Sequence, residues 1–170
     1  MVVNIKSRVL QVWKWVGLIW LVGFITFMVY DFAVNWPKAQ LVQSQLESEF
    51  KSIEPLPGAG AFDYAATHKT RQALVTSKYR TNLPYAEMRA HYDSELARHG
   101  WVFYEEEQMR DWGIDFGGKT ARYCKGGYRA NLEYAGGQAD YGWDYAFSVS
   151  WGLGSLVDKY SDKFSKAGCR

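Results

Sequence analysis

The feature that most constrains this chain is an unbroken apolar run near the N-terminus, which extends from Val16 to Tyr30. A helix rises about 1.5 Å per residue, so this run alone covers roughly 22 Å. With its flanks, the segment 12–34 is long enough to cross a hydrocarbon core of about 30 Å. We therefore interpret residues 12–34 as a membrane-spanning helix. Aromatic side chains of the kind that favour membrane–water interfaces stand at both ends of it: Trp13, Trp15, Tyr30 and Trp36.

Basic residues in front of this run predict its orientation. Three Lys and Arg and no Asp or Glu precede Val16, a bias that keeps the tail, residues 1–11, in the cytoplasm. A cleaved signal peptide is the alternative, but cleavage requires small residues at the first and third positions before the cut. A cut after Ala33 would place Asp31 at the third position. We therefore favour an uncleaved, single-pass anchor whose C-terminal domain is exported.

The charges of the exported part exclude one class of partner. After residue 34 the chain has 17 Lys and Arg and 17 Asp and Glu. A domain that binds nucleic acid is expected to carry a basic excess. We therefore predict no nucleic-acid partner.

An amphipathic stripe follows the membrane segment. Apolar residues recur between residues 37 and 53 at helical spacing, which predicts a stalk helix continuing outward from the membrane. Such a stripe needs a cover, either the chain's own domain or another protein, and we favour its own domain. The Pro- and Gly-rich segment 54–64 is predicted to be a linker, followed by one periplasmic domain over residues 65–170. The stripe consists of Val42, Leu46, Phe50 and Ile53.

Alternating apolar and polar residues in the exported part predict β-strands. A helix is expected between them over residues 84–98, where proline suits the first turn and glycine follows the end. We therefore predict an α+β fold in which an antiparallel sheet of about five strands carries one or two helices on one face. The expected strands are residues 72–81, 101–104, 119–124, 128–134 and 143–151.

Residues 108–118 are predicted to form a long connection between strands, and long loops often carry function. Apolar residues alternate there with charges and glycines. We hypothesise that this loop contacts a partner protein or a glycan, with the tryptophan as its anchor. The alternative is a strand arm folded onto the core. The hypothesis concerns Asp111, Trp112, Ile114, Asp115 and Phe116.

No motif indicates catalysis. The three histidines are scattered rather than set at metal-ligand spacing, and no Gly-x-Ser-x-Gly elbow occurs. We predict no catalytic residues, no cofactor and no metal. The two cysteines, Cys124 and Cys169, allow at most one disulfide, and the sequence leaves open whether they pair or remain free thiols.

Part of the chain resembles small exported α+β domains of uncharacterised bacterial envelope proteins. The resemblance implies a bacterial inner-membrane setting and the α+β fold, and it brings no catalytic residues with it. We expect a non-enzymatic, membrane-tethered periplasmic module that binds another envelope protein as a subunit or accessory factor. The alternatives are an immunity-type protein that neutralises a periplasm-acting toxin and a cell-envelope enzyme. The resemblance is carried by Tyr79-Arg80-Thr81, Tyr92-Asp93, Leu96 and Gly100-Trp101.

Overall fold

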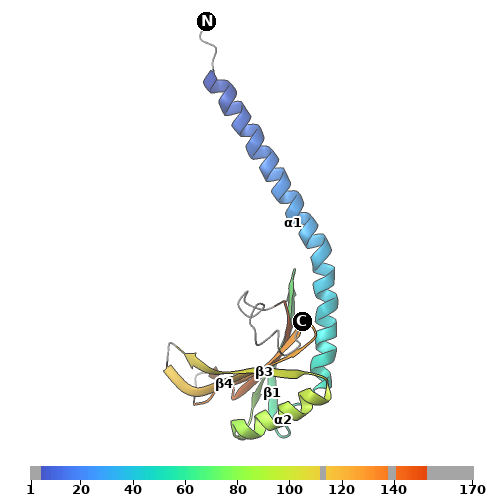
Figure 1. The fold of residues 1–170 in the computed structure, drawn as a ribbon, viewed down its shortest axis with the longest axis vertical. Helices are drawn as coiled ribbons and strands as arrows, with labels where there is room; N and C mark the ends of the chain where they lie inside the picture. Colours follow the sequence, from blue (N-terminus) through green and yellow to red (C-terminus); the bar gives the residue numbers. More distant parts are fainter. Residues whose placement is uncertain (1–4, 112–113, 138–140, 153–170) are drawn as a thin grey trace.

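The structure is a computed structural model that describes residues 5–111, 114–137 and 141–152 of the chain. These residues form an α+β fold: a long N-terminal helix, a six-stranded antiparallel sheet and a second helix (Figure 1). Apolar residues at every fourth position after Ser155 also predict a short final helix, which lies outside the described residues. The helices are α1 (Ile5–Ser52) and α2 (Tyr85–Arg98). The strands are β1 (Gly60–Lys69), β2 (Gln72–Arg80), β3 (Val102–Asp111), β4 (Ile114–Lys125), β5 (Tyr128–Tyr134) and β6 (Tyr145–Trp151).

The first part of α1 is a candidate membrane helix. It is the one helix of the described residues that is long and apolar enough to cross a membrane, with a mean hydropathy of 1.9 over its best stretch. Its large apolar side chains, such as Trp20 and Phe24, are exposed instead of packed against the domain. A helix that is apolar on all sides and uncovered by protein suits a lipid environment. The finding fits a single-pass membrane protein.

The second part of α1 packs on the sheet without any break in the helix. Pro37 lies inside α1, and because proline removes one backbone hydrogen bond and crowds the preceding turn, it bends helices. Figure 1 shows α1 changing direction between the candidate membrane segment and the part beside the sheet. The whole apolar stripe beyond the bend is buried in the hydrophobic core: Val42, Leu46, Phe50 and Ile53. The chain's own domain therefore covers this stripe.

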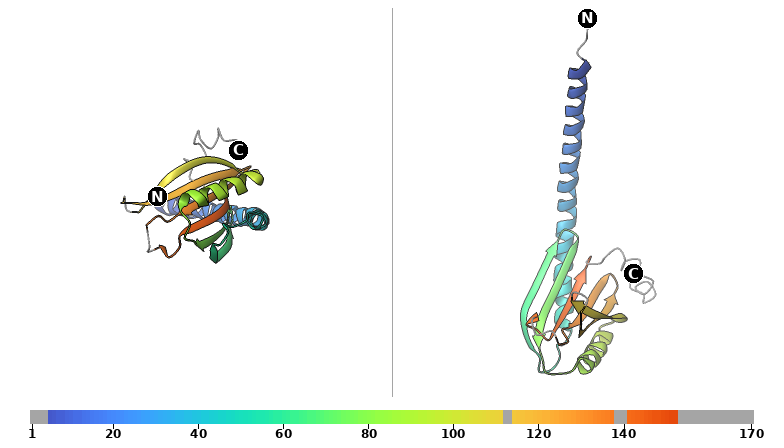
Figure 2. Two further views of the ribbon diagram at one scale, coloured as in Figure 1. Left: turned by 90° about the horizontal axis from the view of Figure 1, so that it is seen from below. Right: turned by 90° about the vertical axis from the view of Figure 1, so that its left-hand side faces the viewer.

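The sheet has the strand order β1-β2-β6-β5-β4-β3, and every neighbouring pair is antiparallel. Two hairpins, β1–β2 and β3–β4, therefore form its two edges. Figure 2 shows β1 and β2 running alongside the second part of α1. β1 was not among the strands predicted from the sequence. It begins at Gly60, inside the predicted linker, so residues 53–59 connect α1 to the sheet.

Both helices cover the same face of the sheet. Register places Val75, Val149, Ala130 and Tyr123 side by side across four strands on this face. α1 packs over β1, β2 and β6, and α2 packs over β3 and β5. The core between them is rich in aromatic rings, and Tyr92 of α2 stacks on Phe147 at 4.8 Å between ring centroids.

Candidate partner interface

Residues 108–118, predicted to be a loop, belong to two paired strands. β3 continues to Asp111 and β4 begins at Ile114, and these two residues are paired. We call the outer part of this hairpin, the described residues of 108–118, the β3–β4 arm. The prediction of a long connection was wrong because residues such as Gly117 and Asp115, which usually indicate turns, lie here within a strand.

The arm presents apolar side chains to solvent. Ile114 is 57% exposed and Phe116 is 37% exposed. Trp112, the expected anchor, lies outside the described residues, so its role stays a prediction. An isolated exposed apolar residue on a surface is ordinary, but two neighbouring ones on an edge hairpin form a surface that a partner could cover.

Asp115, which we hypothesised to contact a partner, forms hydrogen bonds within the arm. Its Oδ1 accepts a hydrogen bond from the backbone N–H of Gly117 at 2.8 Å, and its Oδ2 accepts one from the side chain of Gln108. Asp115 therefore joins the two strands of the arm to each other. Its carboxylate supports the arm's geometry, whereas Ile114 and Phe116 form its apolar surface.

The base of the arm is fixed by the connection that follows β5. The backbone N–H of Gly137 donates to the carbonyl oxygen of Phe116 at 2.8 Å. Gly136 has φ +66°, and a Cβ atom there would lie 2.3 Å from the same oxygen. Only glycine fits this position without movement of its neighbours. The arm is thus braced at its base, close to its exposed apolar side chains.

A charged cluster supports the arm on the α2 side. Glu106 of β3 accepts hydrogen bonds from Tyr85 at 2.8 Å and from Arg89, and Lys119 lies 3.7 Å away. Burial and, second, the hydrogen bond to Glu106 raise the pKa of Tyr85 to about 12. The phenol therefore stays protonated, and the cluster links α2 to the edge hairpin.

Glu105 and Glu107 lie on the opposite face of β3 from Glu106. Arg122 of β4 contacts both of them, at 3.1 Å and 2.8 Å. Successive residues of a strand point to opposite sides, so the three consecutive glutamates are divided between two clusters. Each of these carboxylates is engaged in an ion pair that holds β3 against a neighbour.

Two features of this region were not anticipated from the sequence. Val102 and Phe103, at the other end of β3, are exposed apolar residues, and the guanidinium of Arg89 lies 4.1 Å from the Phe103 ring centroid. Glu95 of α2 is fully buried and accepts a hydrogen bond from the backbone N–H of Glu54. Arg98 and His99, three and four positions later along the chain, contact its carboxylate, and this spacing could have signalled the pairing.

The predicted absence of a metal site stays a prediction. Within the described ranges, no three His, Cys, Asp or Glu side chains gather closely enough to hold a metal ion. Cys124 of β4 is buried and takes part in a disulfide. Cys169 is the other cysteine of the sequence and lies outside the described residues.

Comparison with known proteins adds no family to these observations: no protein-family model matches the chain, and no curated protein or solved structure is detectably similar to it.

Proposed function

We propose that this protein is a non-enzymatic, membrane-tethered module that binds another envelope protein through the β3–β4 arm. The observation that carries the proposal is the arrangement of two parts of one rigid domain. The helix with the candidate membrane segment is built into the core under β1, β2 and β6. The arm, at the opposite edge of the sheet, exposes Ile114 and Phe116.

The proposed setting is a bacterial inner membrane, with the N-terminus in the cytoplasm and the sheet in the periplasm. The basic tail in front of the apolar segment supports this orientation, because positive charge is retained on the cytoplasmic side. A disulfide at Cys124 also agrees with it, since disulfides persist in the periplasm and are rare in the cytosol.

Packing in the core explains the raised pKa values of three tyrosines. Burial raises the pKa of Tyr145 to about 12 and moves the pKa of Tyr92 and of Tyr123 further above their ordinary value. Enzymes usually shift acids and bases toward the pH at which they work. These shifts lead away from neutral pH, as expected for tyrosines packed in a core.

Purification in mild detergent tests the proposed binding. The full-length chain is tagged, cross-linked in cells and recovered with its partner, alongside the variants Ile114→Ser and Trp112→Ala. We expect each variant to lose most of the partner while the protein remains folded. Val102→Ser is the matched control, because Val102 is also an exposed aliphatic residue, 48% exposed, at the far end of the same hairpin.

Two results would contradict the proposal. Equal partner recovery from Ile114→Ser and the parent chain would show that the arm is not the interface. Recovery of one soluble toxin in a one-to-one complex would replace the proposal with the immunity-type function.

Orientation is tested separately by cysteine labelling. We expect a cysteine at Thr70 to react with a membrane-impermeant thiol reagent when the outer membrane is permeabilised. A cysteine at Ser7 should react only after the inner membrane is lysed. The reverse pattern would place the sheet in the cytoplasm.

A further inference from the structure

The turn of the β1–β2 hairpin lies beside the point where α1 would leave the membrane. This turn consists of Thr70 and Arg71, between the paired residues Lys69 and Gln72. The guanidinium of Arg71 forms an ion pair with Asp31 of α1. The hairpin therefore reaches back along the helix to the first acidic residue after the apolar run.

Helix length places this contact at the membrane surface. Trp13 and Asp31 are about 27 Å apart along an ideal helix axis, close to the hydrocarbon thickness of about 30 Å. If Trp13 lies at one interface, Asp31 lies at the other. The headgroup layer extends roughly 5–7 Å beyond the hydrocarbon core. Arg71 then lies within this layer, and Lys38, about 10 Å beyond Asp31 along the helix, lies at its outer limit.

The turn is held firmly in this position. A Cβ atom on Gly152, just after β6, would lie 2.1 Å from the carbonyl oxygen of Arg71, so the two backbones are in close contact. His68, next to the turn, packs edge-on against Trp36 with ring centroids 4.7 Å apart. Through the contact between His68 and Trp36, the β1–β2 hairpin thus packs directly against α1.

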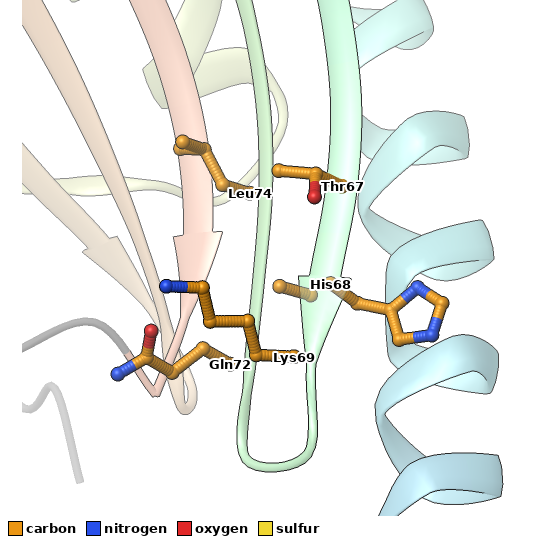
Figure 3. Close-up of a pocket in the computed structure, with 6 residues that line it drawn as sticks. Thr67, His68, Lys69, Gln72 and Leu74 are labelled. Carbon is orange, nitrogen blue, oxygen red and sulfur yellow. The ribbon is translucent and has the colours of Figure 1, made fainter.

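The charges at this end of the domain are mainly basic. Of the described residues near the turn, Lys38, Lys69 and Arg71 are basic, and Asp31, which pairs with Arg71, is acidic. Figure 3 shows His68 pointing toward α1, whereas Lys69, Gln72 and Leu74 point to the other side of the hairpin. A hollow of about 270 Å³ lies there, bordered by Lys69, Gln72 and Leu74 among others. A lysine beside a partly apolar hollow at headgroup level suits a phospholipid.

We propose that the β1–β2 turn binds anionic phospholipid headgroups of the membrane that α1 crosses, chiefly through Lys69 and, less directly, through the ion-paired Arg71. The lipid phosphates complement these side chains, since each Lys or Arg close to an anionic surface strengthens its attraction by about fivefold. The sheet then rests directly on the membrane rather than at the end of a stalk. This inference shares with the proposed function only the membrane segment of α1.

The test measures how close the turn lies to the lipid headgroups. The full-length chain carries a fluorophore on a cysteine at Thr70 and is placed in nanodiscs that contain a headgroup quencher. One set of nanodiscs is phosphatidylcholine alone, and the other also contains phosphatidylglycerol. We expect stronger quenching with phosphatidylglycerol, reduced by salt because exposed charges are screened.

Three substitutions locate the effect. Lys69→Gln should weaken the phosphatidylglycerol-dependent binding of the turn by about fivefold. Lys51→Gln, an exposed lysine at the opposite end of α1, is the matched control and should change nothing. Asp31→Asn frees Arg71 from its ion pair, so it should leave the response to phosphatidylglycerol intact or increase it.

Several outcomes would overturn the inference. Equal quenching in both lipid mixtures would show that the turn does not recognise anionic headgroups. Equal effects of Lys69→Gln and Lys51→Gln would show that only overall charge matters. Loss of the lipid response in Asp31→Asn would show that the ion pair positions the turn and that lipid does not. Ile114→Ser should leave the quenching unchanged, which separates this test from that of the partner interface.

Discussion

The β1–β2 and β3–β4 hairpins form the two edges of one sheet, but they differ in what surrounds them. The first lies against α1 and is joined to it by an ion pair at its turn. The second extends away from α1 (Figure 1) and keeps Ile114 and Phe116 exposed. Both hairpins have connections of two residues, so turn length does not explain the difference. The hairpins differ instead in their contact with α1, which packs along the first.

This comparison supports the proposed division between an edge held by α1 and an edge that binds a partner. Exposed strand edges invite unwanted pairing, and proteins usually cover them or charge them. Here α1 lies along one edge region, whereas the three glutamates of β3 place charge along the other. The covered edge is the β1–β2 hairpin, beside α1. The charged edge is the β3–β4 hairpin, whose arm is the proposed partner interface.

The largest effect is expected where α1 enters the core. Leu46→Ala removes a side chain with no exposed surface, which typically costs 2–5 kcal/mol of unfolding free energy because a cavity remains. Urea unfolding of the full chain in detergent, followed by tryptophan fluorescence, measures this loss. Leu41→Ala is the matched control, since Leu41 lies on the same helix and is 61% exposed. Similar losses in both variants would show that α1 is not part of the core.

A second effect is expected at the base of the arm. Gly136→Ala forces a residue with a side chain into a left-handed conformation and against the Phe116 carbonyl. Gly142→Ala has the same conformational penalty, about 1–2 kcal/mol, but meets no atom within 4 Å. The difference between their unfolding free energies isolates the contact, and we expect Gly136→Ala to be less stable by about 2 kcal/mol. Equal values would mean that the arm is not braced there.

A smaller, pH-dependent effect is expected at Glu133 of β5, between the two hairpins. Burial raises the pKa of this carboxyl, and nearby Arg122 only partly offsets the shift. A raised pKa in the folded state favours the protonated form, so Glu133 contributes most below its unfolded pKa of about 4.3 and loses that contribution as pH rises through the folded value.

Glu133→Gln should therefore stabilise the protein at pH 7, and the gain should shrink as pH falls toward 4. Thermal unfolding of the variant and the parent chain at several pH values measures this. A gain that stays constant across the pH range would show that titration of Glu133 is not its cause.

The smallest effect is expected at the arm itself. Ile114→Ser should change the unfolding free energy by less than about 0.5 kcal/mol, because the side chain is mostly in solvent. The same urea experiment measures it. A loss comparable with that of Leu46→Ala would remove the contrast between the two hairpins and identify Ile114 as a core residue.

Sequence pattern predicts those parts of the fold in which local signals agree with the tertiary structure. The α+β class, α2 and strand β5 follow from periodicity, because α2 and β5 each have one buried and one more exposed side. β6 alternates in sequence but is largely buried on both sides. β1 escapes prediction, since six of its ten residues are exposed in succession and give no alternation. Its pairing with β2 comes from tertiary context instead.

The candidate site was less predictable than the fold. The residues of the arm were selected because they alternate, but glycines near Phe116 indicated a loop. The contact between Gly136 and Phe116, which fixes the arm, joins segments that are separated along the chain and leaves no local signal. The position of the β1–β2 turn was also not predicted, because the ion pair between Arg71 and Asp31 depends on how the whole hairpin folds back along α1.

One continuous helix joins the candidate membrane segment to the core, so no loop separates them. Leu46 and Phe50 pack in the core against the strands. A change in the tilt of the membrane segment would therefore rotate the whole domain. A force exerted on the arm by a bound protein would in turn be transmitted through α1 to the membrane segment. α1 would bend most easily at Pro37.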